Sequence, residues 1–156
     1  MSEEPSPARS HRSLVADMRL ALLSEIGARS AYDHLRGRVR DGDLEGLLAR
    51  LNQEGAENVE RLSALIRELG GLPPRTSLRR RILARLLAAS TPIVGLRIVL
   101  RVCLNAEETV ARWYGEYAHF LAALGQTTRA RTCEQLRQVK LAHASALSAW
   151  ITHMKP

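Results

Sequence analysis

The chain has 156 residues, a formal net charge of +7 and a hydrophobic fraction of 46%, with only 4% aromatic residues. This length fits one compact domain with its own hydrophobic core, and the many Ala, Leu and Arg residues favour helices because they lose little conformational freedom there. The basic charge lacks the interleaved aromatic residues that bind single-stranded nucleic acid, so nucleic acid is not the expected partner. The composition predicts an all-α protein.

The N-terminal residues differ in composition from the rest of the chain. Residues 1–10 are polar and rich in Pro and Ser, which predicts a disordered leader followed by one domain over residues 11–156. This leader does not have the pattern of a signal peptide. The longest stretch without a charged residue or histidine, Leu86 to Leu96, is too short to span a bilayer. We therefore expect a cytoplasmic protein.

The first two predicted helices form a hairpin. Apolar residues recur at helical spacing from Leu14 to Leu35. A break at residues 41–43 follows, where Asp43 can cap a second helix at its N-terminus. The second helix carries the same apolar periodicity and ends at Gly70-Gly71.

The second half of the chain repeats this pattern after a long connection. Residues 72–91 are basic and are expected to contain one short helix. Thr91-Pro92 is a start signal, because a capping hydroxyl precedes proline at the first helical position, and the third long helix is predicted from there to about Leu124. Thr127 or Thr128 can cap a fourth helix that ends near Met154. Two helical hairpins joined by a long crossover form the connectivity of ferritin-like four-helix bundles.

Each long helix carries polar residues on its apolar stripe. A carboxylate buried there must be paired, neutralised or bound to a cation, because an unpaired one costs several kcal/mol. Polar groups at similar depth on four helices therefore indicate a site in the core. Glu54 has a second interpretation, since Arg50 and Arg61 can pair with it outside the core. The residues in question are Glu25, Glu54, Asn58, Glu107, Lys140 and His143.

Two segments resemble a known family. Residues 24–32 read SEIGARSAY and resemble the Gly-Glu-x-Gly-Ala…Tyr opening of the demethoxyubiquinone hydroxylases, which are diiron members of the ferritin-like superfamily. Residues 106–114 read AEETVARWY and resemble the third-helix stretch of that family, in which the first glutamate is a metal ligand. Gln53-Glu54, followed by Leu62 to Ile66, is similar to its second-helix segment. The resemblance extends over residues 14–150 and implies a dinuclear metal site.

The intact site takes one glutamate from each of two helices and Glu-x-x-His from each of the other two. The resemblance implies that Glu25 and Glu107 are metal carboxylates. On the fourth predicted helix, His143 matches the histidine, but Lys140 stands at the glutamate position.

On the second predicted helix, the resemblance leaves two registers open. In one register Glu54 matches the glutamate, and Glu57 stands at the histidine position. A shift by one residue puts Gly55 and Asn58 at these positions, and it suits the following leucines better. The resemblance thus gives, as candidate metal ligands, Glu25, Glu54, Glu57, Glu107 and His143, with Asn58 and Lys140 as residues that modify the site.

Lys140 is the sharpest departure from the family pattern. Its ammonium adds a positive charge beside any bound cation, and its attraction to the neighbouring carboxylates can replace part of the charge of a metal. Oxygen-rich sites suit iron and manganese, but the loss of one carboxylate and one histidine weakens the binding of both metals. We expect iron or manganese at low occupancy or none.

Two functions are consistent with these observations. The first is a diiron-type oxidoreductase or hydroxylase acting on a quinone-like or other apolar substrate, with no catalytic residue assigned beyond the ligands. The second is a non-catalytic, metal-free bundle whose Lys–carboxylate network supports assembly, for example as a homo-oligomer, or binding to a membrane or partner. Residues 75–104 favour a membrane surface because they combine an arginine cluster with apolar residues. A crossover packed on its own bundle is the competing interpretation.

Overall fold

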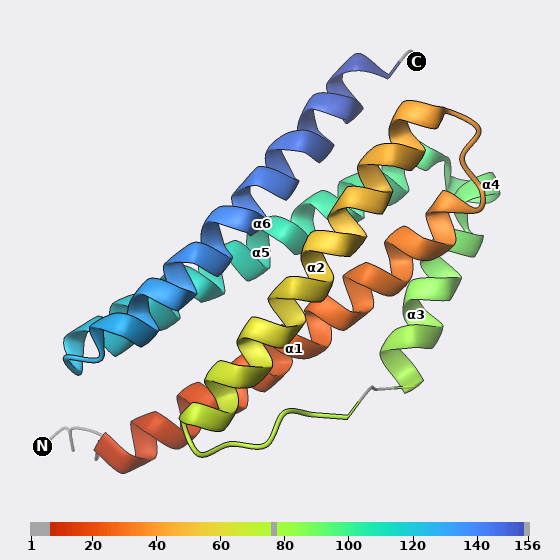
Figure 1. Ribbon diagram of the computed structural model, residues 1–156. Helices are drawn as coiled ribbons and strands as arrows, with labels where there is room; N and C mark the ends of the chain where they lie inside the picture. The colour runs from red at the N-terminus through yellow and green to blue at the C-terminus, as the bar shows by residue number, and fades with distance from the viewer. Residues whose placement is uncertain (1–6, 76–77, 155–156) are drawn as a thin grey trace, which may run out of the picture.

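The computed structural model describes residues 7–75 and 78–154, which form an all-α bundle of two helical hairpins (Figure 1). The predicted all-α class and the long crossover between two hairpins are confirmed. The helices are α1 (Pro7–Arg36), α2 (Gly42–Glu68), α3 (Leu78–Ala89), α4 (Thr91–Val94), α5 (Leu96–Ala123) and α6 (Thr127–His153). The first hairpin is α1–α2, the second is α5–α6, and α3 and α4 belong to the crossover.

The turn of the first hairpin is fixed by one aspartate. Asp41 is the N-cap of α2, and its Oδ1 accepts hydrogen bonds from the backbone N–H groups of Asp43 and Leu44 at 2.9 and 3.1 Å. The prediction that Asp43 caps this helix is therefore wrong, because the N-cap lies two residues earlier, at Asp41. Asp43 lies in the first turn instead, where its negative charge is favourable next to the helix N-terminus.

The end of the crossover, where the third long helix was predicted to begin, differs from the prediction. The helix predicted from Thr91 to about Leu124 is broken, because Gly95 has a φ of 85°, a conformation that a continuing right-handed helix does not allow. The short α4 precedes this break and α5 follows it. α6 begins at Thr127, and its N-cap is Gln126 rather than the predicted Thr127 or Thr128. The side chain of Gln126 makes no capping hydrogen bond.

Only part of the predicted N-terminal leader lies within the residues that the structure describes. α1 already includes residues 7–10 of the predicted leader, and residues 1–6 lie outside the described part of the chain. Over residues 7–75 and 78–154, no helix has the length and apolar character needed to cross a membrane.

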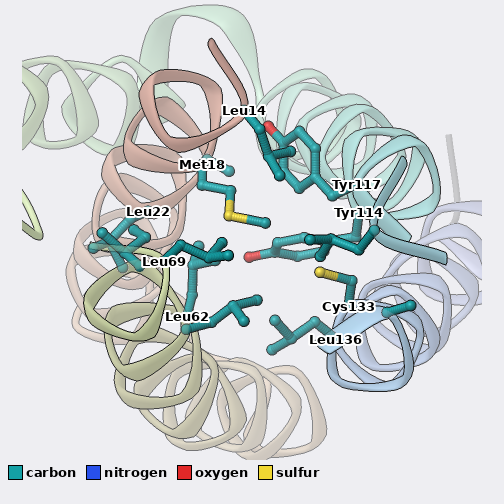
Figure 2. Close-up of a cluster of buried hydrophobic side chains, with 14 of the residues drawn as sticks. Leu14, Met18, Leu22, Leu62, Leu69, Tyr114, Tyr117, Cys133 and Leu136 are labelled. Carbon is teal, nitrogen blue, oxygen red and sulfur yellow. The ribbon is translucent and has the colours of Figure 1, made fainter. Parts of the chain in front are cut away.

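The interior contains two apolar clusters. One cluster fills the half of the bundle that holds the start of α1 and the ends of α2 and α5. Figure 2 shows the ring of Tyr114 in its middle, with Met18 on one side and Cys133 on the other. The second cluster fills the opposite half and includes Tyr32, Leu48 and Leu147.

A polar layer separates the two apolar clusters. On each long helix, its members stand in sequence between residues of the first cluster and residues of the second. All are at most 2% exposed, so water does not solvate them. The polar layer consists of Glu25, Asn58, Glu107, Lys140 and His143.

A buried lysine–carboxylate network

The centre of the polar layer is a lysine between two glutamates. Lys140 Nζ on α6 lies 2.7 Å from Glu25 Oε2 on α1 and 2.8 Å from Glu107 Oε2 on α5. The side chains of all three are at most 2% exposed. The ammonium therefore joins helices of both hairpins through two short, buried ion pairs.

Two tyrosines donate hydrogen bonds to these carboxylates, each to the glutamate of the other hairpin. Tyr32, seven residues after Glu25, donates its hydroxyl to Glu107 Oε1 at 2.5 Å. Tyr114, seven residues after Glu107, donates its hydroxyl to Glu25 Oε1 at 2.8 Å. Each hairpin thus supplies a carboxylate for the other hairpin's tyrosine. The pattern relates the two halves of the fold by an approximate twofold symmetry.

His143 extends the network toward α2. Its Nδ1 lies 3.2 Å from Glu107 Oε2, and its Nε2 lies 2.7 Å from Glu54 Oε2. A neutral imidazole has one N–H, so both contacts are hydrogen bonds only when the ring carries two protons. The side chain of Glu54 is 40% exposed, and its Oε1 lies 4.0 Å from Arg50 Nε. Glu54 therefore stands at the edge of the network, where it faces both the core and the solvent-exposed Arg50.

Burial and charge act against each other on the two central carboxyls. Burial raises the pKa of Glu107, but Lys140 and His143 outweigh it and lower this pKa to about 2. Burial raises the pKa of Glu25 above its usual value, because the attraction of Lys140 offsets only part of the cost of desolvation. Glu107 is therefore the more firmly ionised of the two carboxylates.

The donors of the network keep their protons. Burial lowers the pKa of Lys140, but Glu25 and Glu107 together raise it above its usual value, so the ammonium stays charged. Burial, followed by the charge of the neighbouring carboxylate, raises the pKa of Tyr32 and of Tyr114 well above the usual range. Both hydroxyls are neutral donors at physiological pH.

The inward face of α2 follows the shifted register. Gly55 and Asn58 are buried, whereas Glu57 is exposed and belongs to none of the contacts of the network. One residue turns a helix by about 100°, so a buried Asn58 places Glu57 on the outer surface. The register that gave Glu57 the histidine position is therefore wrong. Asn58 Nδ2 has no hydrogen-bond partner among the described residues.

The structure brings together most of the side chains singled out from the sequence. Glu25, Glu107, Lys140 and His143 meet in the polar layer, and Glu54 reaches it from the edge. Metal binding by these residues stays a prediction. The roles of the two tyrosines were missed, although the seven-residue interval from glutamate to tyrosine occurs in both hairpins. This repeated interval was the one sequence feature noted that indicated related roles for the two tyrosines.

The donor set does not fit a dinuclear metal centre. Three of the six positions of the intact pattern hold Gly55, Asn58 and Lys140, which supply no carboxylate and no imidazole. The Lys140 ammonium also lies between the two carboxylates, Glu25 and Glu107, that the family resemblance implies as metal ligands. In the described part of the chain, no group of three or more His, Cys, Asp or Glu side chains is placed to hold a metal ion.

Replacing Lys140 by Met leaves two buried carboxylates without their cation. We expect the free energy of unfolding at pH 7 to fall by about 3–5 kcal/mol, as when one partner of a buried ion pair is removed. Denaturant unfolding followed by circular dichroism measures this loss. Arg131→Met, at an exposed position of the same helix, is the control and should change stability by less than about 1 kcal/mol. Adding Glu25→Gln to Lys140→Met should restore part of the lost stability, because it removes one of the two unpaired carboxylates. If Lys140→Met lowers stability as little as Arg131→Met does, the role of Lys140 is contradicted.

Glu107 makes stability dependent on pH in the acid range. Its pKa of about 2 in the folded chain lies below its ordinary value of 4.5. Its stabilisation is therefore complete above pH 4.5 and is lost as the pH falls toward 2. The expected contribution is on the order of 3 kcal/mol. The raised pKa of Glu25 acts in the opposite direction, so the test compares variants.

Glu107→Gln should lose less stability than the wild type when the pH is lowered through this range, measured by urea unfolding at a series of pH values. Glu108→Gln changes the exposed neighbouring residue and should keep the wild-type pH dependence. If Glu107→Gln also keeps it, the pH dependence arises elsewhere.

The fold has a counterpart among solved structures. A crystal structure of ferritin like, diiron-carboxylate proteins from Bacillus anthracis str. Ames matches this chain with a TM-score of 0.76 and 18% sequence identity. The match covers 97% of this chain and 99% of that chain. No protein-family model and no curated protein matches the sequence. Kinship with the demethoxyubiquinone hydroxylases in particular stays a prediction, whereas the fold itself is confirmed: this chain has the ferritin-like fold.

Proposed function

We propose that this chain is a ferritin-like protein that works without a dinuclear metal centre, as a binding or assembly module rather than an oxygen-activating enzyme. The observation that carries this proposal is the position of Lys140 Nζ, 2.7 and 2.8 Å from the two central carboxylates. The solved ferritin-like structure is described as a diiron-carboxylate protein. In this chain, an ammonium stands where two such carboxylates would otherwise share a metal.

The charge balance supports the proposal. An ammonium and a divalent metal ion a few ångströms apart repel each other strongly in a site from which water is excluded. Lys140 Nζ and His143 Nδ1 both contact Glu107 Oε2. The Lys140 ammonium thus supplies, from the protein's own side chains, part of the positive charge that a dimetal centre would bring.

The lost ligands on α2 support it as well. At Gly55 no carboxylate remains, and an added Cβ would lie 3.0 Å from Arg29 Cγ, so the side chain of Arg29 fills the space. Arg29 Nε donates to the side-chain oxygen of Asn52 at 3.0 Å, which holds it in that position. The competing oxidoreductase hypothesis needs metal ligands where the chain has a glycine, an asparagine and a lysine.

Metal analysis tests the proposal directly. Protein purified without chelator and incubated anaerobically with ferrous iron, and separately with Mn²⁺, should retain less than one equivalent of either metal. Lys140→Glu removes the ammonium and restores a carboxylate, so metal binding should increase. The triple variant Gly55→Glu, Asn58→His, Lys140→Glu restores all six ligand types and should approach two equivalents, provided that Arg29 moves aside.

Arg131→Glu makes the same change of charge at an exposed position of α6 and is the matched control. It should bind no more metal than the wild type. Two equivalents of iron bound to the wild type would overturn the proposal, as would equal metal binding before and after Lys140→Glu.

A second observation favours an anionic membrane surface as the partner. Among the residues whose burial is described, seven of the eleven exposed large hydrophobic side chains lie between residues 82 and 102. We call this set the outer crossover face. It consists of Ile82, Leu83, Leu86, Ile93, Val94, Ile98 and Val102.

The crossover does pack on its own bundle, which was the competing interpretation: α3 lies against α1, and Ala88 is buried in the second apolar cluster. The outer crossover face is the side of this segment that stays exposed. Arg75, Arg85 and Arg101 are exposed within or beside it, whereas the side chains of Arg79, Arg80 and Arg81 lie outside the described part of the chain. Apolar residues together with arginines suit the interface of a membrane that contains anionic lipids.

Replacing two residues of the outer crossover face by glutamate tests this candidate. Leu86→Glu with Ile98→Glu should reduce co-sedimentation with phosphatidylglycerol-containing vesicles at low salt by about tenfold or more, since two apolar contacts are lost and two like charges are added. Leu20→Glu with Leu141→Glu changes exposed leucines outside the face and should leave binding unchanged. Failure of the wild type to co-sediment would remove the membrane, and concentration-dependent dimerisation abolished by the first variant would assign the face to a second copy of the chain.

A further inference from the structure

A pocket of about 380 Å³ lies between α1, α3 and α5, next to the polar layer. This volume falls in the range of small-molecule sites, which is roughly 300–1,000 Å³. None of its lining residues, all within the described part of the chain, is charged. Tyr32 and Cys103 line the pocket and are also members of the second apolar cluster. The pocket therefore extends from the surface to the core beside the charged network.

Small residues keep this space open. Gly27, Ala28 and Ala31 on α1 face Ala106 on α5 across the pocket. A Cβ added at Gly27 would meet no other atom within 4 Å. Glycine in a helix interior costs stability relative to residues that carry a side chain. The pocket is therefore open because the residues that line it on α1 and α5 include several with small side chains.

The polar side chains that line the pocket are uncharged. The hydroxyl of Tyr32 donates to Glu107 Oε1 and is not free to donate to a ligand. Burial and the nearby charge of Glu107 raise the pKa of Cys103 to about 12, so its thiol stays neutral. A charged ligand group would find no partner here and would lose its hydration.

The mouth of the pocket is apolar. Leu83 on α3 is 63% exposed and Val102 on α5 is 44% exposed, and both line the pocket and belong to the outer crossover face. Leu87, one turn after Leu83, lies deeper. A molecule entering here passes exposed hydrocarbon before it reaches Tyr32.

We propose that this pocket binds an uncharged hydrocarbon chain, with the chain inserted between α1 and α5 toward Tyr32. The lining matches such a chain in polarity, and its small residues leave room for one. The chain can come from a free neutral amphiphile or from a single-chain membrane lipid. This inference goes beyond the proposed function, and its failure would leave the metal and vesicle experiments unaffected.

Displacement of an uncharged fluorescent probe tests the pocket. N-phenyl-1-naphthylamine should bind the wild-type protein with increased fluorescence, and 1-dodecanol should displace it. Gly27→Leu fills the pocket with four carbon atoms, and it should weaken binding of both molecules by at least about tenfold.

Gly46→Leu is the matched control. Gly46 is an exposed glycine within α2, an added Cβ there also meets no atom within 4 Å, and it does not line the pocket. Both substitutions replace a helical glycine by a good helix former, so both should maintain or raise the melting temperature. If Gly27→Leu loses binding while its melting temperature is maintained, the loss is due to the filled pocket and not to unfolding.

A separate titration with palmitoyl-lysophosphatidylcholine below its micelle concentration distinguishes the two sources. Displacement by this lipid and by dodecanol assigns the pocket to lipid chains, and displacement by dodecanol alone assigns it to free neutral amphiphiles. Absence of probe binding to the wild type, or equal displacement curves for the wild type and Gly27→Leu, would overturn the proposal.

Discussion

The constraint on which the rest of the structure depends is the pairing of charge in the middle of the bundle. Glu25, Glu107 and Lys140 are almost completely removed from water, and each carboxylate without the ammonium would cost several kcal/mol. The three positions are therefore interdependent, because loss of Lys140 leaves both carboxylates without a cation. The apolar clusters on both sides exclude the water that could otherwise rescue an unpaired charge.

The symmetry of this layer shows how it departs from a metal site. Tyr32 and Tyr114 donate crosswise to the two carboxylates, so the two hairpins contribute equally to that part. The cation is asymmetric, because α6 supplies Lys140 and the corresponding buried position of α2 is Gly55. A dimetal centre places charge near both hairpins, whereas one lysine can only come from one of them. His143, held between Glu107 and Glu54, links the network to the α2 side.

The sequence predicted the parts of this site that follow from periodicity. Glu25, Glu107 and His143 stand at helical spacing among apolar residues, and their burial follows from that spacing. The register of α2 was ambiguous because Glu54 is an acidic residue next to a glycine, and a glycine gives no signal of its inward position. The Asp41 cap uses extended backbone angles that most residue types adopt, so the sequence does not single it out. The break at Gly95 uses a positive φ that favours glycine, but a glycine in a sequence does not by itself show that it adopts this conformation. The crosswise tyrosine bonds required knowledge of how the hairpins face each other.

The proposed replacement of metal ions by a side-chain cation bears on what the rest of the fold can do. A metal site that activates oxygen needs an open coordination position, whereas an ammonium enclosed by two carboxylates presents none. Two features that suit an apolar partner are the pocket beside Tyr32 and the outer crossover face around its mouth. Because Tyr32 both lines the pocket and donates to Glu107, a ligand there would contact the hydrogen-bonded network through a neutral hydroxyl. The network thus fixes one wall of the pocket, because the hydrogen bond to Glu107 holds the hydroxyl of Tyr32 in place.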